Sequence, residues 1–467
     1  MIVLIRNDSI FISAVVAILF LVPSQHVLSF TPIQTLTKTT NDSNYLYKAK
    51  TSLTKLHSTI MVSPPNIDDL PVSGGDADSA FRHGTNLERN GLLRTAHAAY
   101  HEAATLYQCF LDQDIKSKSH EFSHVTELIH QNENGEQEQD GYYMCRKYLA
   151  DACMRLAFLS FDALGDPKAS IRLYKEATMI DPKPNAIAFD GIGTSIEGSF
   201  PGNLKDAVKA YRKSLEIEDN GHTRFHLGVA LERLGEASTA EEIMDGLRRS
   251  EASVACLVDS WGYIRWHTRR IPNDELNLYL GTRNVLQIGL EAAMDLVMDD
   301  NGLVCEFGVA TGRSLRMMQE LLPLLTPLHG FDTFHGLPSS WGGTPAGTFS
   351  TGGALPNMEG NVYFHQGLFR DSIPDFLESM SMRDYQPLAF ANIDCAMYGS
   401  TLEILEKMHS RVVPGTVFVF ADYIGHPSWR QDEFRAWREC CKRFGWQYEY
   451  LGFSFATKQV VVRITSA

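Results

Sequence analysis

The stretch Leu303-Val-Cys-Glu306-Phe-Gly308-Val-Ala-Thr311-Gly312-Arg-Ser314-Leu315 decides the fold of the C-terminal part of the chain. An apolar run ends in an acid, a turn with two glycines follows, and a helix is predicted to begin near Ser314. Glycines let the backbone of such a turn approach a ligand closely, and the helix N-terminus offers free N–H groups to a carboxylate. The spacing is E-x-G-x-x-x-G rather than G-x-G-x-x-G, which disfavours a dinucleotide. Taken alone, the pattern is also that of an ordinary tight turn between a strand and a helix.

Three further apolar runs end in acids, which indicates an α/β domain with a mainly parallel sheet. Leu328-His-Gly-Phe-Asp332 ends about 26 residues after Glu306. Consecutive strands of a doubly wound sheet place their carboxyl ends side by side, so Asp332 is predicted to accept the hydroxyls of a ribose. The runs Pro387 to Asp394 and Val413 to Asp422 follow the same rule, and the loop at Gln366-Gly367 lies where an adenine would bind. The final segments, Tyr448 to Gly452 and Gln459 to Ile464, predict an antiparallel hairpin at the edge of the sheet.

In order and spacing, these motifs resemble the macrocin O-methyltransferase family, a branch of the class I S-adenosylmethionine (SAM)-dependent methyltransferases. The resemblance covers about 190 residues and is carried by four motifs and the final hairpin: Gly330-Phe-Asp-Thr-Phe-His-Gly-Leu-Pro338, Gly367-Leu-Phe-Arg-Asp-Ser-Ile-Pro374, Ile393-Asp-Cys-Ala-Met-Tyr-Gly-Ser400 and Pro414-Gly-Thr-Val-Phe-Val-Phe420. It implies a Rossmann-like sheet of seven strands and methyl transfer to a hydroxyl, often on a sugar or secondary metabolite. The cofactor-binding residues that it implies are Glu306, Gly308, Thr311, Gly312, Ser314, Asp332, Gln366 and Gly367.

The chain departs from the family where a divalent metal would bind. Family members usually carry aspartates at the positions of Ala396 and Ala421. Asp394 and Asp422 remain at the two strand ends and are the candidate Mg²⁺ ligands, because Mg²⁺ needs few protein oxygens and keeps several waters.

Methyl transfer asks the protein to align the acceptor and to remove its proton. Asp394 is the first candidate for the catalytic base, either directly or through a metal-bound alkoxide. His426, four residues after Asp422, is the second candidate. Trp341 and the glycine-rich stretch 342–353 are interpreted as a mobile lid over the substrate, although a plain surface loop would have the same composition.

Residues 77–268 are predicted to form an all-α superhelical domain of tetratricopeptide repeats. Four units carry a glycine followed by small and large residues at fixed offsets. The spacing from Gly202 to Gly235 is near the 34-residue period of these repeats, that from Gly165 to Gly202 is slightly longer, and an insert separates the first two units. The four sets are Gly91, Ala96, Tyr100 and Ala103; Gly165, Ser170, Tyr174 and Ala177; Gly202, Ala207, Tyr211 and Ser214; and Gly235, Ala240, Met244 and Leu247. A disordered polar insert is predicted at about 111–141 and a hinge at 269–274, after which the methyltransferase domain occupies 275–467.

The repeats have two interpretations. Their concave face could bind a protein or peptide, or they could only brace the C-terminal domain. For the whole chain, an active O-methyltransferase acting on a small-molecule hydroxyl is the first hypothesis. The alternative is a repeat scaffold whose methyltransferase domain is degenerate, which Ala396 and Ala421 favour.

The N-terminus carries targeting signals. Residues 1–29 have the basic start, apolar run and small residues of a signal peptide, and the run is short for a membrane span, so no stable span is expected in the mature protein. Residues 30–76 are predicted to be a disordered, transit-peptide-like stretch, because residues 31–60 are rich in Ser and Thr and carry four lysines against one acid. Together they predict a plastid protein, with the secretory pathway as the alternative.

Net charge and cysteine spacing argue against nucleic-acid binding and against zinc or disulfide sites. The net charge of −14 without a basic run argues against nucleic-acid binding. The eight cysteines form no CxxC pair, so reduced thiols are favoured over zinc or disulfides.

Overall fold

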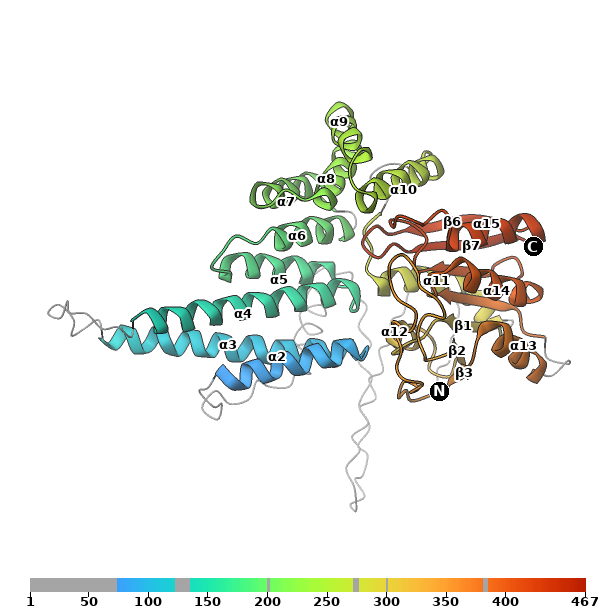
Figure 1. Ribbon diagram of the computed structural model, residues 1–467, viewed down its shortest axis with the longest axis horizontal. Helices are drawn as coiled ribbons and strands as arrows, with labels where there is room; N and C mark the ends of the chain where they lie inside the picture. The colour runs from blue at the N-terminus through green and yellow to red at the C-terminus, as the bar shows by residue number, and fades with distance from the viewer. Residues whose placement is uncertain (1–73, 122–134, 200–201, 272–276, 300, 381–384) are drawn as a thin grey trace, which may run out of the picture. The chain divides into compact units, whose positions relative to one another are not determined.

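The computed structural model describes residues 74–121, 135–199, 202–271, 277–299, 301–380 and 385–467 (Figure 1). The predicted signal peptide and residues 30–73 of the transit-like stretch lie outside the described residues. Pro71–Ala467 form one compact unit. Its N-terminal part is helical, and its C-terminal part is built on one sheet.

Helices pair into antiparallel hairpins over the predicted repeats. The hairpins are α2 (Gly74–Arg89) with α3 (Leu93–Glu121), α4 (Gly135–Asp162) with α5 (Pro167–Ile180), α6 (Ala186–Gly198) with α7 (Leu204–Ile217), and α8 (Gly221–Arg233) with α9 (Ala237–Arg248); α10 (Ala252–Thr268) follows. Helices α5 to α8 each begin behind a side chain that caps a free N–H group of the first turn: Asp166, Asn185, Asn203 and Asn220.

The small and large residues that define the repeats are buried between the helices. Tyr100, Tyr211 and Met244 each cover a glycine of the preceding helix, respectively Gly84, Gly193 and Gly228. A Cβ atom at any of these glycines would collide with the side chain above it, so the pairing of a large residue with a glycine sets the close approach of the two helices. The structure thus confirms a helical repeat region.

Two predicted boundaries differ from the structure. α3 continues to Glu121 and α4 begins at Gly135, so helix extends into both ends of the insert expected at 111–141. The polar composition of these segments suits exposed helix as well as loop, and pattern reasoning could not separate the two. Residues 122–134 of the insert and 272–276, which include half of the predicted hinge, lie outside the described residues.

The C-terminal part contains a sheet of seven strands in the order β3-β2-β1-β4-β5-β7-β6. The strands are β1 (Leu303–Phe307), β2 (Leu328–Asp332), β3 (Val362–Gln366), β4 (Leu388–Ile393), β5 (Val417–Phe420), β6 (Gln447–Phe453) and β7 (Val460–Ser466). The first five are parallel, and β6 and β7 form the predicted antiparallel hairpin. The strand order reverses between β1 and β4, since β2 and β3 follow on one side of β1 and β4 and β5 on the other. The crevice outside the carboxyl ends of β1 and β4 is therefore where such folds bind ligands.

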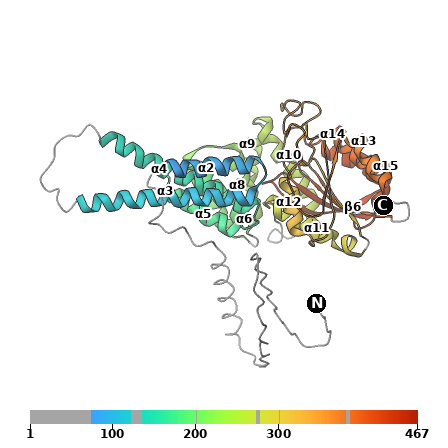
Figure 2. The same ribbon diagram turned by 90° about the horizontal axis from the view of Figure 1, so that it is seen from below.

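Helices cover both faces of the sheet. α11 (Thr282–Asp299) and α12 (Arg313–Leu321) lie on one face, and α13 (Phe369–Ser379), α14 (Tyr398–Met408) and α15 (Glu433–Phe444) lie on the other (Figure 2). A short 3₁₀ turn, His409–Arg411, follows α14. Strands β1, β4 and β5 are buried along their whole length, as expected for central parallel strands.

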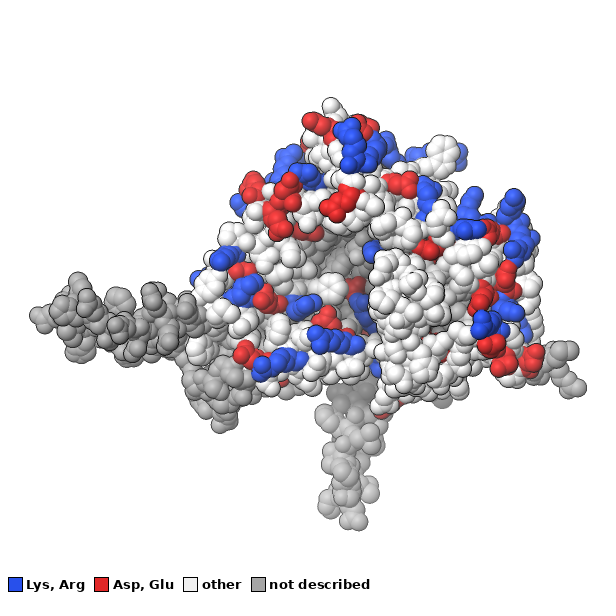
Figure 3. Space-filling model, viewed as in Figure 1, with Lys and Arg blue, Asp and Glu red and all other residues white. Residues whose placement is uncertain are grey.

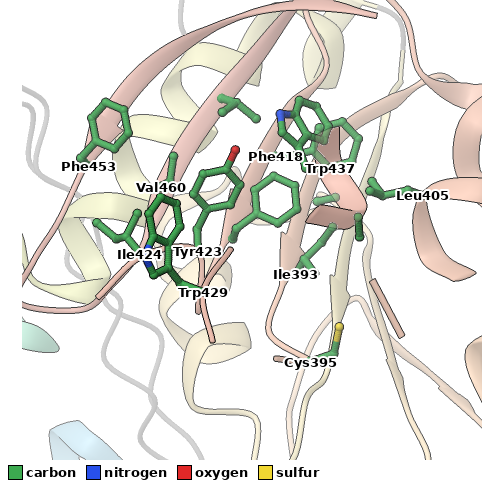
Figure 4. Close-up of a cluster of buried hydrophobic side chains, with 14 of the residues drawn as sticks. Ile393, Cys395, Leu405, Phe418, Tyr423, Ile424, Trp429, Trp437, Phe453 and Val460 are labelled. Carbon is green, nitrogen blue, oxygen red and sulfur yellow. The ribbon is translucent and has the colours of Figure 1, made fainter. Parts of the chain in front are cut away.

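The repeats and the sheet share their hydrophobic cores. One cluster joins Phe225, Val254 and Trp261 of the repeats to residues of β4, β5 and β7, and its C-terminal portion is drawn in Figure 4. The rings of Phe225 and Phe455 meet edge to face with centroids 4.8 Å apart. A second cluster joins Tyr100 and Leu156 to α11, α12 and the strands. The repeats therefore pack against the sheet domain as part of one folded unit.

Charges of both signs are interspersed over the described part of the face drawn in Figure 3. No helix in the described residues combines the length and apolar character needed to cross a bilayer.

The shared core is tested by Phe225→Ala. This side chain is fully buried and spans the two parts, so its loss should cost about 3–5 kcal/mol and lower the melting temperature measured by calorimetry. Ile187→Ala, at a residue that is 67% exposed on α6, should change stability by less than about 0.5 kcal/mol. An unchanged melting temperature for Phe225→Ala would contradict a shared core.

Candidate functional site

A cavity of about 950 Å³ opens at the carboxyl ends of β1, β2, β4 and β5. Its volume lies in the range of small-molecule sites. The predicted residues that line it are Gly308, Thr311, Ser314, Asp332, Gly367, Asp394 and Asp422. Four other predicted residues do not line it: Glu306, Gly312, Gln366 and His426.

Glu306 lies beneath the cavity and joins α12 to strand β4 through hydrogen bonds. Its side chain is fully buried, and one oxygen accepts hydrogen bonds from Ser314 and, at 2.8 Å, from the Asn392 amide of β4. Burial raises the pKa of Glu306 to about 8, and the two hydrogen bonds oppose that rise. In this structure Glu306 therefore fixes the start of α12 against the sheet. Asn392 faces Glu306 in the register of β1 and β4, a pairing that no motif announced.

Asp332 holds the loop after β1. One carboxylate oxygen accepts the backbone N–H groups of Val309 and Ala310, both at 2.8 Å, and the other accepts that of Phe334 at 2.7 Å. A carboxylate has about four acceptor positions. Asp332 thus uses most of its acceptor positions on backbone N–H groups, and ribose hydroxyls would have to share the remaining acceptor position.

The backbone around the cavity occupies unusual conformations. Gly308 has φ +95°, and a Cβ atom there would overlap the carbonyl oxygen of Asp394, so only glycine fits where β1 meets β4. Four residues other than glycine that line the cavity also have positive φ: Ala310, Phe349, Ala396 and Lys458. Such conformations cost about 1–3 kcal/mol each and concentrate at functional sites.

Two acids open onto the cavity from the ends of β4 and β5. Asp394 is exposed to solvent through the open cavity, but the protein atoms around the cavity partly desolvate its carboxyl and raise its pKa to about 7. Repulsion from Asp422 adds to the rise, whereas the charge of Arg313 opposes it. Burial also raises the pKa of Asp422, and Lys458 opposes that rise. Behind them, burial raises the pKa of Glu433 well above its usual range, and its carboxylate accepts the N–H of Asp422 at 2.9 Å.

His426 is engaged elsewhere. Its Nε2 lies 2.8 Å from the carbonyl oxygen of Asp422, which requires the Nε2–H tautomer, and Nδ1 lies 3.4 Å from the Ser428 hydroxyl. The side chain is 5% exposed and packs against Trp341. This arrangement gives His426 a structural role in the loop after β5 and leaves Asp394 as the base candidate on the cavity wall.

The predicted lid forms one side of the cavity. Trp341 and Phe349 line it, and the Trp341 indole donates to Asp432 at 3.0 Å. Backbone hydrogen bonds close the loop on itself, including Leu337 N to Thr348 O and Gly347 N to Leu337 O.

The predicted metal position carries two carboxylates, Asp394 and Asp422, and no larger ligand group is found in the part of the chain that the structure describes. In the described ranges, no group of three or more His, Cys, Asp or Glu side chains is placed to hold a metal ion. Ala396 and Ala421 both line the cavity beside Asp394 and Asp422, and their methyl groups supply no ligand atom.

Sequence reasoning missed one end of the cavity. Five polar residues line it from the start of α11, the start of α12 and the turn between β6 and β7: Thr282, Arg313, Thr457, Lys458 and Gln459. Three of them carry buried polar atoms that lack a hydrogen-bond partner, namely Arg313 Nε, Thr457 Oγ1 and Gln459 Oε1. Unpaired buried polar atoms are costly, so such atoms in a cavity wall suit a polar ligand. Gln459 belonged to the final motif, but nothing in the spacing placed it beside Arg313.

Comparison with known proteins identifies the domain. The sheet and its cavity have the arrangement that the sequence predicted for a SAM-dependent methyltransferase domain, and helical repeats precede it. Residues 354–443 match the family described as Macrocin-O-methyltransferase (TylF), so the C-terminal domain is macrocin O-methyltransferase-like. No curated protein matches the chain.

Several solved structures are similar to parts of the chain. The calicheamicin methyltransferase CalS11 is 21% identical over 49% of this chain and 92% of its own, with a TM-score of 0.31. The O-methyltransferase NovP is 19% identical over 44% and 88%, with a TM-score of 0.30. The TPR2AB domain of yeast Sti1 is 12% identical over 44% and 98%, with a TM-score of 0.13.

The collision at Gly308 is tested by Gly308→Ala. The new Cβ atom would displace the backbone of Asp394, so we expect affinity for S-adenosylhomocysteine to fall by at least about tenfold, which is about 1.4 kcal/mol. Gly235→Ala is the matched control, because Gly235 has a similar φ of +87° in a repeat turn and nothing within 4 Å of its Cβ position. Calorimetric titration of both variants checks this, and equal losses would show that strain alone matters.

Proposed function

We propose that this protein transfers the methyl group of SAM to a hydroxyl oxygen of a small molecule, of which a sugar or secondary metabolite is one class. The observation that carries the proposal is the single cavity that joins the loop after β1 to Asp394. The family match at residues 354–443 supports the same activity.

The residues present fit SAM. Gly308 lets the loop after β1 lie directly against the end of β4, and three residues with unpaired buried polar atoms, Arg313, Thr457 and Gln459, line the cavity. Gly308, Thr311 and Ser314 would contact the cofactor from the loop after β1, Asp332 from β2 and Gly367 from β3. Bound SAM supplies a methyl group already activated on a sulfonium.

Asp394 would remove the acceptor's proton. As the acceptor oxygen bonds to the methyl carbon, the carbon–sulfur bond breaks, the electron pair goes to sulfur, and the hydroxyl proton goes to the Asp394 carboxylate. A pKa of about 7 suits a base that works near neutral pH. Asp422 lies beside it at the end of β5, and the turn of Thr457 to Gln459 offers polar atoms to the acceptor. No metal is needed for this route.

The full-length chain tests the proposal by titration with SAM and by an unbiased search for metabolites that gain a labelled methyl group. We expect SAM to bind, and Asp394→Asn to retain binding within a few fold while turnover falls at least about a hundredfold. Since the ionised carboxylate is the base, wild-type kcat should rise as pH increases through about 7, and residual activity of Asp394→Asn should lack that step.

Absence of SAM binding up to millimolar concentration would overturn the proposal and favour the repeat scaffold. Binding with wild-type turnover in Asp394→Asn would reject Asp394 as the base. Turnover that requires an added divalent cation would reject the metal-free route.

For localisation, we propose import into a plastid, on the basis of the signal-like and transit-like composition of residues 1–76. A fluorescent fusion of residues 1–76 should enter plastids of an alga with secondary plastids. Secretion or retention in endomembranes would contradict this proposal.

A further inference from the structure

A carboxylate from the repeats reaches the wall of the cavity. Asp162 is the last residue of α4 and is only 3% exposed. One of its oxygens accepts the backbone N–H of Thr282 at 3.0 Å and the Thr282 hydroxyl at 2.7 Å. The other oxygen accepts a hydrogen bond from the guanidinium of Arg313. Asp162 therefore caps α11 and holds Arg313, and both Thr282 and Arg313 line the cavity.

The repeats contact the same loop at other points. Gly91, in the turn between α2 and α3, has φ +70°, and a Cβ atom there would lie 2.7 Å from the Thr311 hydroxyl oxygen and 3.2 Å from Arg313 N. Arg94 of α3 forms a two-pronged ion pair with Glu320 of α12, at 2.6 and 2.7 Å. The N-terminal turn of α12 is thus held by the repeats through Asp162 and the turn at Gly91, and by Glu306 through its hydrogen bond with Ser314.

Arg313 has capacity for a second anionic partner. Its guanidinium is a planar fork with five N–H donors. One arm meets Asp162, whereas Nε is buried without a partner. The side chain is 41% exposed and lines the cavity.

The position of Arg313 in the cavity indicates which anionic ligand it would bind. It follows the glycine loop on the cofactor half of the cavity, and its charge is felt at Asp394. The other cations of the wall lie elsewhere: Arg370 is in the first turn of α13, after β3, and Lys458 lies in the β6–β7 turn. The amino-acid end of SAM carries a carboxylate, the ligand that a guanidinium fork binds best.

We propose that Arg313 binds the carboxylate of the amino-acid part of SAM and that Asp162 is the positioning residue that aims it. This inference rests on the proposed function. It makes the repeats part of the cofactor site, because a repeat residue would set the orientation of a cofactor ligand.

The test compares two ligands that differ in the amino-acid part. S-adenosylhomocysteine carries the carboxylate, and 5′-methylthioadenosine lacks the whole amino-acid group. In calorimetric titrations of the full chain, Arg313→Gln should weaken S-adenosylhomocysteine by at least about tenfold and change 5′-methylthioadenosine by less than about twofold. Asp162→Asn should show the same selectivity with a smaller loss, and Arg313→Lys should recover part of the affinity because it keeps the charge.

Arg94→Gln is the matched control. It removes another ion pair between the repeats and α12, but its partner Glu320 does not line the cavity, so both affinities should stay unchanged. Melting temperatures identify variants that fail to fold, and Arg313→Gln, on a partly exposed side chain, keeps the test valid if Asp162→Asn does not fold.

The outcomes separate the two proposals. Equal losses for both ligands, or no loss in Arg313→Gln, would overturn the assignment of Arg313 while leaving the proposed function intact. A wild-type protein that binds neither ligand would overturn both.

Discussion

Carboxylates that bind the loop after β1 are the constraint on which the site depends. Asp332 accepts the backbone N–H groups at the start of the loop, and Glu306 accepts the hydroxyl of Ser314 below it. Asp162 accepts Arg313 from the side of the repeats. A glycine-containing loop would otherwise sample many conformations. These three carboxylates belong to three different elements, and together they hold the loop in one conformation.

The same constraint explains why repeats and sheet form one unit. The loop after β1 is held by residues of both the repeats and the sheet domain, so its conformation is fixed only if these two parts do not move independently. The shared clusters around Phe225 and Tyr100 join the two parts. Of the two interpretations of the repeats, bracing of the C-terminal domain agrees with these contacts. A peptide partner on the concave face stays a prediction.

The acidic end of the cavity is explained as a site that accepts a proton and not as a metal site. Asp394, Asp422 and Glu433 lie close together, and burial raises the pKa of each. Repulsion among them raises the pKa of Asp394 and of Glu433 further. Where the family carries further acids, Ala396 and Ala421 stand here. With two fewer acids beside it, Asp394 experiences less of the repulsion that raises its pKa, so its ionised form is favoured. This is why the proposed chemistry uses the carboxylate directly as the base.

Periodicity and motif order determined much of this protein from the sequence alone. The repeats, the seven-stranded sheet with its terminal hairpin, and the line of acids at the strand ends all follow from local patterns of apolar residues, glycines and acids. Such patterns report on neighbours along the chain and on the ends of adjacent strands.

What each polar atom does was decided only by the tertiary structure. Glu306 and His426 form hydrogen bonds with Asn392 and the Asp422 carbonyl, which come into reach only after folding. Asp162 is 151 residues from Arg313, and no spacing rule connects a repeat helix to a cofactor loop. Burial, and with it the pKa of Asp394, likewise depends on atoms brought together from the whole chain. The sequence therefore determined which elements form and in what order, while long-range packing determined which side chains face the cavity.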